Sequence, residues 1–157
     1  MQYTLVDLLR TEHIRLNLDA KDAQDAIRKL TVPLVETGHV TSGFPEDVLA
    51  REQTYPTGLP TRPLAVAIPH ADPDHVHQSA ICIGILKSPV RFAQMGTDGS
   101  VLLDAHLIFL LAIKEQEKQV EMIRQLMTLI QTGSLLEGLM KVGDSNDAIA
   151  LLQNTLV

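Results

Sequence analysis

The sequence predicts an α/β protein with a mixed central β-sheet flanked by helices on both faces. Three short, strongly apolar runs are typical of buried strands, namely residues 64–68, 80–86 and 106–113. Around them lie stretches whose apolar residues recur at helical spacing. The 157 residues, 45% of them hydrophobic and 20% charged, fit a single globular domain over residues 1–157. The order of the strands does not follow from the sequence.

The amino-terminal part is expected to form one strand and one helix. Residues 14–18 alternate apolar and polar side chains, which predicts a half-buried strand. Apolar residues then follow at helical spacing over residues 23–35, with Asp19 as the expected N-cap and Gly38 beyond the end. Pro33 lies inside this pattern, and we expect it to kink or split the helix because proline lacks an N–H group.

The middle of the chain is expected to carry a short helix, a loop and further strands. A helix over residues 45–53 would have Pro45 in its first turn and Arg51 near its end. The loop over residues 55–63 is rich in proline and glycine, which interrupt regular structure. Residues 90–92 predict a short, separate piece of strand between the second and third apolar runs.

The carboxyl-terminal part is expected to be helical. From Lys114 onward the apolar residues recur at helical spacing. The residues expected on the buried face of this helix are Val120, Ile123, Leu126, Met127 and Ile130. A second helix should begin near Leu135, and a third should run over residues 145–152.

Composition narrows the classes of function. The net charge of -6 disfavours binding to nucleic acid, which requires clustered Lys and Arg. Cys82 is the only cysteine and lies in an apolar run, which predicts a buried, unreactive thiol. The first residues resemble no signal peptide, and no apolar run approaches the roughly 20 residues that span a bilayer. We therefore expect a cytoplasmic protein that reaches the membrane only through a partner.

The strongest candidate for chemistry is His70, which follows the strand at 64–68. Pro69 is expected to end that strand and leave His70 at its carboxyl end, the edge where sites form in open α/β sheets. Asp72 and Pro73 match an N-cap and a first-turn proline. We therefore expect a helix whose free N–H groups and positive dipole end face His70, a position that suits a phosphoryl group.

An imidazole is a suitable carrier of a phosphoryl group. It is nucleophilic when neutral, and its pKa lies near physiological pH. Transfer between two carriers depends on positioning and on compensation of the charge on the phosphoryl oxygens. An arginine, backbone N–H groups and neutral donors supply both, so no cofactor is expected.

A family signature is visible in three segments: Arg51-Glu52, Pro56-Thr57-Gly58-Leu59-Pro60 and Val66-Ala67-Ile68-Pro69-His70. They resemble the fructose/mannitol-type (type-2) enzyme IIA domains of the bacterial phosphotransferase system, and the similarity covers nearly the whole chain. The resemblance implies that a histidine accepts a phosphoryl group from the carrier HPr and passes it to a cysteine of enzyme IIB. The membrane enzyme IIC would be an indirect partner.

The resemblance also implies roles for three residues. His70 matches the phosphorylated histidine, with Nε2 as the expected nitrogen, and Arg51 matches an arginine implicated at the same site. Many members have a second histidine early in the helix after the last strand, and Gln119 occupies that place here. Its amide can donate a hydrogen bond to a phosphoryl oxygen but carries no charge. Gln119 and the sequence Thr57-Gly58-Leu59-Pro60-Thr61 resemble the galactitol-type subgroup, which favours a galactitol-like sugar alcohol.

Two other functions remain open. A regulatory IIA paralogue would use the same chemistry at His70 and would signal through its phosphorylation state. A metal-dependent hydrolase is the second alternative, because His70, Asp72, His75 and His77 lie close together in the sequence. Their spacing matches no strong pattern of metal ligands, so no metal is expected.

Overall fold

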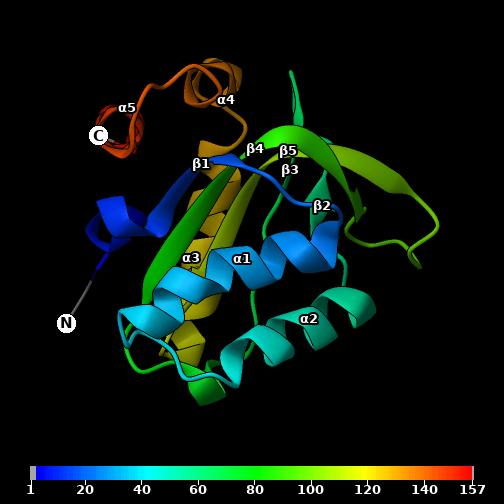
Figure 1. Cartoon of the computed structure of the whole chain (residues 1–157), viewed down its shortest axis with the longest axis vertical. Helices are drawn as coiled ribbons and strands as arrows, with labels where there is room; N and C mark the ends of the chain where they lie inside the picture. Colours follow the sequence, from blue (N-terminus) through cyan, green and yellow to red (C-terminus); the bar gives the residue numbers. More distant parts are fainter. Residues whose placement is uncertain (1–2, 157) are drawn as a thin grey trace.

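The computed structural model describes residues 3–156, and these contain a five-stranded mixed sheet. The strands are β1 (Ile14–Leu18), β2 (Gly58–Leu59), β3 (Ala65–Ala67), β4 (Ala80–Ala93) and β5 (Leu102–Ala112). Their order across the sheet is β1-β4-β5-β3-β2 (Figure 1). β1 runs parallel to β4 and β3 runs parallel to β5, whereas the pairs β4–β5 and β2–β3 are antiparallel. The predicted mixed sheet is confirmed.

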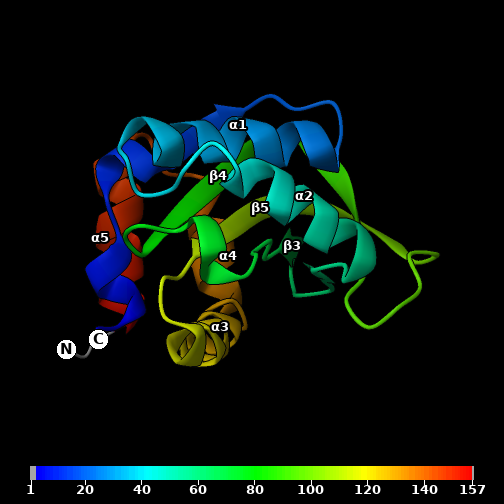
Figure 2. The same cartoon turned by 90° about the horizontal axis from the view of Figure 1, so that it is seen from below.

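Helices cover both faces of the sheet, which confirms the predicted three layers (Figure 2). The helices are α1 (Ala23–Glu36), α2 (Phe44–Thr54), α3 (Gln116–Leu129), α4 (Gly133–Leu139) and α5 (Ser145–Leu156). The 3₁₀ turns are η1 (Leu5–Leu8), η2 (Thr11–His13) and η3 (Pro73–His75). One apolar core joins α1 and α2 to the sheet, and a second core joins α3, α4, α5 and η1 to its other face.

α1 starts later than predicted and continues through Pro33. Its N-cap is Asp22 rather than Asp19, because the Asp22 carboxylate accepts a first-turn N–H at 2.8 Å. Pro33 has no N–H to donate to the Lys29 carbonyl, and this carbonyl accepts a hydrogen bond from Arg15 Nη1 at 3.1 Å instead. A side chain from β1 thus replaces the hydrogen bond that proline removes, and the helix is not split.

β4 is one strand of 14 residues, so the separate strand predicted at residues 90–92 is part of it. Its register against β5 shifts between Ile85 and Val90. Pro89 lies within this shift, where the ladder is interrupted and a missing N–H group is tolerated. β5 begins at Leu102, before its predicted start, because its first residues pair with the far half of β4.

The predicted buried face of α3 is confirmed except at Val120. Leu126 and Ile130 are buried, and Ile123 and Met127 are partly buried against the same core. Val120, expected in the core, is 61% exposed. Gln119, Met122 and Leu129 complete the inner face. Neighbouring residues of a helix lie about 100° apart around its axis, so Gln119 can be buried while Val120 is exposed.

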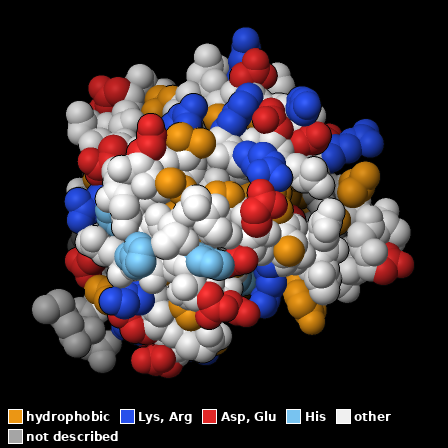
Figure 3. Space-filling model, turned by 60° about the horizontal axis from the view of Figure 1, so that its bottom comes forward, with side chains coloured by type: hydrophobic (Ala, Val, Ile, Leu, Met, Phe, Trp, Pro, Cys, Tyr) orange, Lys and Arg blue, Asp and Glu red, His pale blue; other side chains and the backbone are white. Residues whose placement is uncertain are grey.

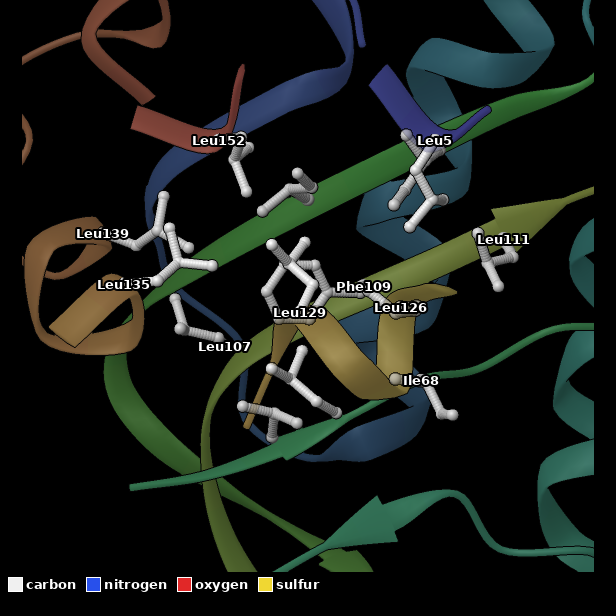
Figure 4. Packing of buried hydrophobic residues seen from close by; sticks show 14 of the residues in the cluster. Leu5, Ile68, Leu107, Phe109, Leu111, Leu126, Leu129, Leu135, Leu139 and Leu152 are labelled. Carbon is white, nitrogen blue, oxygen red and sulfur yellow. The ribbon is translucent and has the colours of Figure 1, made fainter. Parts of the chain in front are cut away.

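The core beneath α3 holds the chain segment that leads to His70. Figure 4 shows Ile68 among the core side chains, with Leu126 and Phe109 in the same cluster. All three are fully buried. Because interiors are close-packed, this environment fixes the position of Ile68 and of its backbone carbonyl.

Cys82 is fully buried in β4, and burial raises the pKa of its thiol to about 12, as expected of an unreactive core cysteine. Within residues 3–156, no helix combines the length and apolar character needed to cross a membrane.

Two buried histidines, His13 and His39, lie side by side where η2 meets the end of α1, with ring centroids 4.8 Å apart. The Thr37 hydroxyl donates to the Pro33 carbonyl at 2.8 Å and accepts from His13 Nε2 at 3.1 Å and His39 Nδ1 at 2.8 Å. The other ring nitrogens are buried without a hydrogen-bond partner in the described part of the chain. Burial lowers the pKa of His13 to about 4 and also lowers the pKa of His39.

We expect acid to destabilise the fold through this pair. Between about pH 6.5 and pH 4 the unfolded chain binds a proton that folded His13 does not, so the free energy of unfolding falls as the pH falls. His13→Gln should remove roughly 2 kcal/mol of this pH dependence in urea unfolding curves measured across the range. His77→Gln, at an exposed histidine, should keep the wild-type slope. An unchanged slope in His13→Gln would contradict the interpretation.

Candidate functional site

β3 ends at Ala67, but its pairing with β5 continues to His70. The Leu111 N–H donates to the Pro69 carbonyl at 3.0 Å, and His70 pairs with Leu111 in a parallel bridge. Proline fits this position because the ladder uses only its carbonyl here. The sheet therefore places His70 at the carboxyl end of a strand, as predicted.

The helix predicted to start after Asp72 does not form. Residues 73–75 make a single 3₁₀ turn, and the Asp72 side chain makes no capping hydrogen bond. The chain cannot continue as a helix because the His77 N–H bonds to the His39 carbonyl at 2.8 Å and ties the segment to the end of α1. One short turn does not supply a helix dipole, so the helix N-terminus expected to face His70 is absent.

The His70 ring is held in one tautomer. Its Nδ1 lies 2.9 Å from the Ile68 carbonyl oxygen. A carbonyl only accepts hydrogen bonds, so Nδ1 carries the proton and Nε2 carries the lone pair. Burial lowers the pKa of His70 and Arg51 lowers it further, while the Ile68 carbonyl and Asp72 act in the opposite direction. The imidazole is therefore neutral near pH 7 and can act as a nucleophile through Nε2.

Arg51 lies in the last turn of α2 and reaches the loop that follows His70. Its Nη1 is 3.5 Å from Asp72 Oδ1, and its guanidinium carbon is 4.8 Å from the centroid of the Tyr55 ring. Its Nε is buried and has no hydrogen-bond partner among residues 3–156. Buried donors are usually paired, so Arg51 has an unused donor that a ligand could satisfy.

An open cleft of about 310 Å³ lies between the end of α2 and the loop that directly follows His70. Its lining includes Arg51 of α2, Tyr55 just after α2, and Ala71 and Asp72 of the loop after His70. Figure 3 views the molecule with its lower side brought forward and shows histidine side chains beside acidic and basic ones. The cleft thus combines a cation, an aromatic ring and the loop after His70, and two of its charged residues, Arg51 and Asp72, act on the His70 imidazole.

Gln119 approaches the same loop from α3. Its side chain is buried, and Nε2 donates to the Ala71 carbonyl at 2.7 Å. Gln119 thus bonds the residue next to His70 rather than the imidazole itself. An amide nitrogen has a second N–H group, which keeps the predicted contact with a phosphoryl oxygen chemically possible.

Glu52 supports the segment that carries His70, although the sequence predicted no role for it beyond its place in the signature. Its carboxylate accepts the Thr57 N–H at 2.8 Å and the Thr57 hydroxyl at 2.7 Å. The Thr57 carbonyl in turn accepts the Ile68 N–H at 3.3 Å. Burial raises the pKa of Glu52 to about 7, and the hydrogen bonds from Thr57 oppose this rise. The only signal in the sequence was the position of Glu52 directly after Arg51.

The histidines after His70 are not gathered into a metal site. Within the part of the chain that the structure describes, no three His, Cys, Asp or Glu side chains are grouped to hold a metal ion. His75 Nδ1 bonds to Asp47 Oδ2 of α2. Its ring covers Gly43, where a Cβ atom would lie 2.8 Å from His75 Nε2. His75 therefore ties η3 to α2, and His77 is exposed.

Comparison with known proteins shows the family to which the chain belongs. Residues 7–155 match the family described as the phosphoenolpyruvate-dependent sugar phosphotransferase system, EIIA 2. The chain belongs to this EIIA family. It is accordingly a phosphotransferase component that serves as a phosphocarrier for a sugar phosphotransferase system.

Relatives of this EIIA domain include transport and regulatory proteins. The galactitol-specific EIIA component of Escherichia coli K12 is 25% identical over 132 residues, which cover 84% of this chain and 87% of that protein. The enzyme IIA of the Escherichia coli mannitol system, solved in complex with phosphorylated enzyme IIB, is similar with a TM-score of 0.75 and 25% identity, over 93% of this chain and 97% of that chain. The nitrogen regulatory protein IIA-Ntr of Neisseria meningitidis is similar with a TM-score of 0.73 and 25% identity, over 94% and 97% of the two chains.

We expect Gln119→Leu to destabilise this EIIA domain at the loop after His70. The change leaves the Ala71 carbonyl without its donor in a buried position, which should cost about 1–3 kcal/mol in the free energy of unfolding. Gln116→Leu, on the exposed side of α3, is the control and should change the value by less than about 0.5 kcal/mol. Equal effects of the two substitutions in urea unfolding would show that the hydrogen bond contributes nothing measurable.

Proposed function

We propose that residues 1–157 act as one cytoplasmic domain that carries a phosphoryl group on Nε2 of His70. The donor is phospho-HPr, and the acceptor is a cysteine of an enzyme IIB that works with a membrane enzyme IIC. The observation that carries the proposal is the hydrogen bond from His70 Nδ1 to the Ile68 carbonyl. It leaves Nε2 as the nucleophilic atom of a neutral imidazole beside an arginine with an unused donor.

Both transfer steps proceed without moving a proton on His70. In the loading step the Nε2 lone pair attacks phosphorus while the N–P bond of the donor phosphohistidine breaks. Nδ1 keeps its proton, so the phosphorylated ring is cationic, and the Ile68 carbonyl accepts its N–H. In the unloading step a thiolate of enzyme IIB attacks phosphorus, and the electrons of the N–P bond return to Nε2. The neutral ring is then restored.

Two helices supply the groups that would support the phosphoryl oxygens. Arg51 on α2 contributes a cation with several N–H donors, and guanidinium groups match the geometry of phosphoryl oxygens. Gln119 on α3 contributes a neutral N–H donor and holds the loop at Ala71. Preorganised donors of this kind act mainly on the charge that develops during transfer.

The similarity to the galactitol-specific EIIA component, together with Gln119 in place of a second histidine, favours a galactitol-like sugar alcohol as the transported substrate. The mannitol IIA that was solved with phosphorylated IIB supports an enzyme IIB as the acceptor. A regulatory role is the second candidate function, and the similarity to IIA-Ntr favours it. Both roles use the same chemistry at His70 and differ in the protein that receives the signal or the group.

Phosphorylation with phosphoenolpyruvate, enzyme I and HPr tests the carrier role. We expect the wild type and His77→Ala to take up one phosphoryl group that is labile in acid and stable in base, and His70→Ala to take up none. Intact-mass measurement after each treatment reads the result, and an unfolding curve confirms that His70→Ala is folded. Labelling of His70→Ala, or no labelling of the folded wild type, would contradict the proposal.

Two exposed apolar side chains, one just after α2 and one on α3, form the docking surface for the protein partners. Tyr55 follows the end of α2 and Val120 lies on α3, and each is 61% exposed. Tyr55 lines the cleft beside Arg51, and Val120 is the neighbour of Gln119. Exposed apolar residues around a site of transfer are typical of protein interfaces.

We expect Val120→Asp to slow transfer from phospho-HPr by about tenfold without changing the free energy of unfolding, because it places a charge in a desolvated contact. Leu102→Asp is the matched control. Leu102 is also exposed but lies at the start of β5, roughly 30 Å along the strand from Leu111 beside His70. Quenched-flow transfer rates that fall equally in both variants would exclude a docking role for Val120.

A further inference from the structure

The contact between Arg51 and Asp72 is longer than a strong hydrogen bond between two charged groups. Arg51 Nη1 and Asp72 Oδ1 are 3.5 Å apart, whereas charge-assisted hydrogen bonds of this kind are about 2.7–2.9 Å long. One nitrogen takes part rather than two, and the Asp72 side chain is 61% exposed. Arg51 Nε meanwhile is buried and has no partner in residues 3–156. The guanidinium is held near the site, but its Nε donor makes no hydrogen bond within residues 3–156.

Both charges also act on the imidazole. Arg51 lowers the pKa of His70 and Asp72 raises it, so the fields of both groups reach the ring that would carry the phosphoryl group. Asp72 is two residues beyond His70, in the loop that lines the cleft with Arg51. A phosphoryl group on Nε2 would therefore meet Arg51 as a partner and Asp72 as a neighbour of like charge.

We propose that Asp72 is a positioning residue that holds Arg51 in the unphosphorylated protein and competes with the phosphoryl group for it. The proposal rests on His70 as the phosphorylated residue. In the phosphorylated protein Arg51 turns its donors to the phosphoryl oxygens, and Asp72 is left unpaired beside a group with a charge close to -2. Asp72 thereby limits the stability of phospho-His70 and keeps the group transferable.

Arg51 has a different partner in each of the two states of the carrier. Any interaction that stabilises phospho-His70 lowers the free energy of the carrier between its two transfers and so slows the second one. Arg51 alone would stabilise the phosphorylated form strongly. A carboxylate that pairs with Arg51 only in the unphosphorylated form stabilises that form, and it repels the phosphoryl group in the other. Both effects favour release to the acceptor.

The test measures the equilibrium between the two carriers. Purified ³²P-phospho-HPr, freed of enzyme I, is mixed with the protein, and the label on each is quantified after equilibration. We expect Asp72→Asn to raise the equilibrium constant for loading by about three- to tenfold and to lengthen the hydrolysis half-life of the phosphoprotein by a similar factor. A purely structural role for Asp72 would change the unfolding curve and leave the equilibrium constant unchanged.

Asp74→Asn is the matched control, because Asp74 is an exposed carboxylate in the same loop and forms no ion pair within the described residues. It removes the same charge without freeing Arg51, and we expect it to change the constant by less than twofold. Two results would overturn this inference and leave the carrier role of His70 intact. One is an equal equilibrium constant for loading in Asp72→Asn and Asp74→Asn, and the other is a lower constant in Asp72→Asn than in the wild type. A folded wild type that takes no label would overturn the carrier role as well.

Discussion

The hydrogen bond between His70 Nδ1 and the Ile68 carbonyl links the chemistry of the protein to its core. The Ile68 side chain is fully buried under α3, so its carbonyl has one position. The backbone N–H of the same residue bonds to Thr57, which the Glu52 carboxylate holds with two hydrogen bonds. The orientation of the imidazole is thus set by close packing and by a short chain of hydrogen bonds rather than by the surface loop alone.

The site is assembled from both helical layers of the fold. α2 belongs to the core on one face of the sheet and supplies Arg51, whereas α3 belongs to the core on the other face and supplies Gln119. The two layers meet at the loop after β3, where Gln119 bonds Ala71 and Arg51 approaches Asp72. Because each helix is anchored in its own core, a change in either core can alter the geometry around His70.

Much of this arrangement could be predicted from local sequence signals. The apolar runs predicted the strands and the three layers, and Pro69 after such a run predicted the position of His70 at the carboxyl end of a strand. The helix after Asp72 was wrong because the cap and proline signals are local, whereas the His77 N–H that ends the segment bonds to a distant carbonyl. Val120 was wrongly expected in the core because the stretch from Val120 to Ile130 offers overlapping apolar stripes, and only the packing of α3 against the sheet selects one. The role of Glu52 was not predicted for a similar reason. Its partner is Thr57, and the path of the chain that brings Thr57 to the Glu52 carboxylate does not follow from the sequence.

The charges around His70 suit a carrier, which must accept and release a phosphoryl group, better than a protein that only binds one. Burial keeps His70 neutral, which preserves its nucleophilicity and also means that no fixed positive charge resides on the ring before loading. Gln119 contributes an amide, which donates a hydrogen bond but adds no charge. Arg51 is the cation that acts on the His70 ring, and Asp72 offsets part of its charge. A site with several unopposed cations would retain a phosphoryl dianion, whereas one cation with a competing carboxylate can accept the group and still release it.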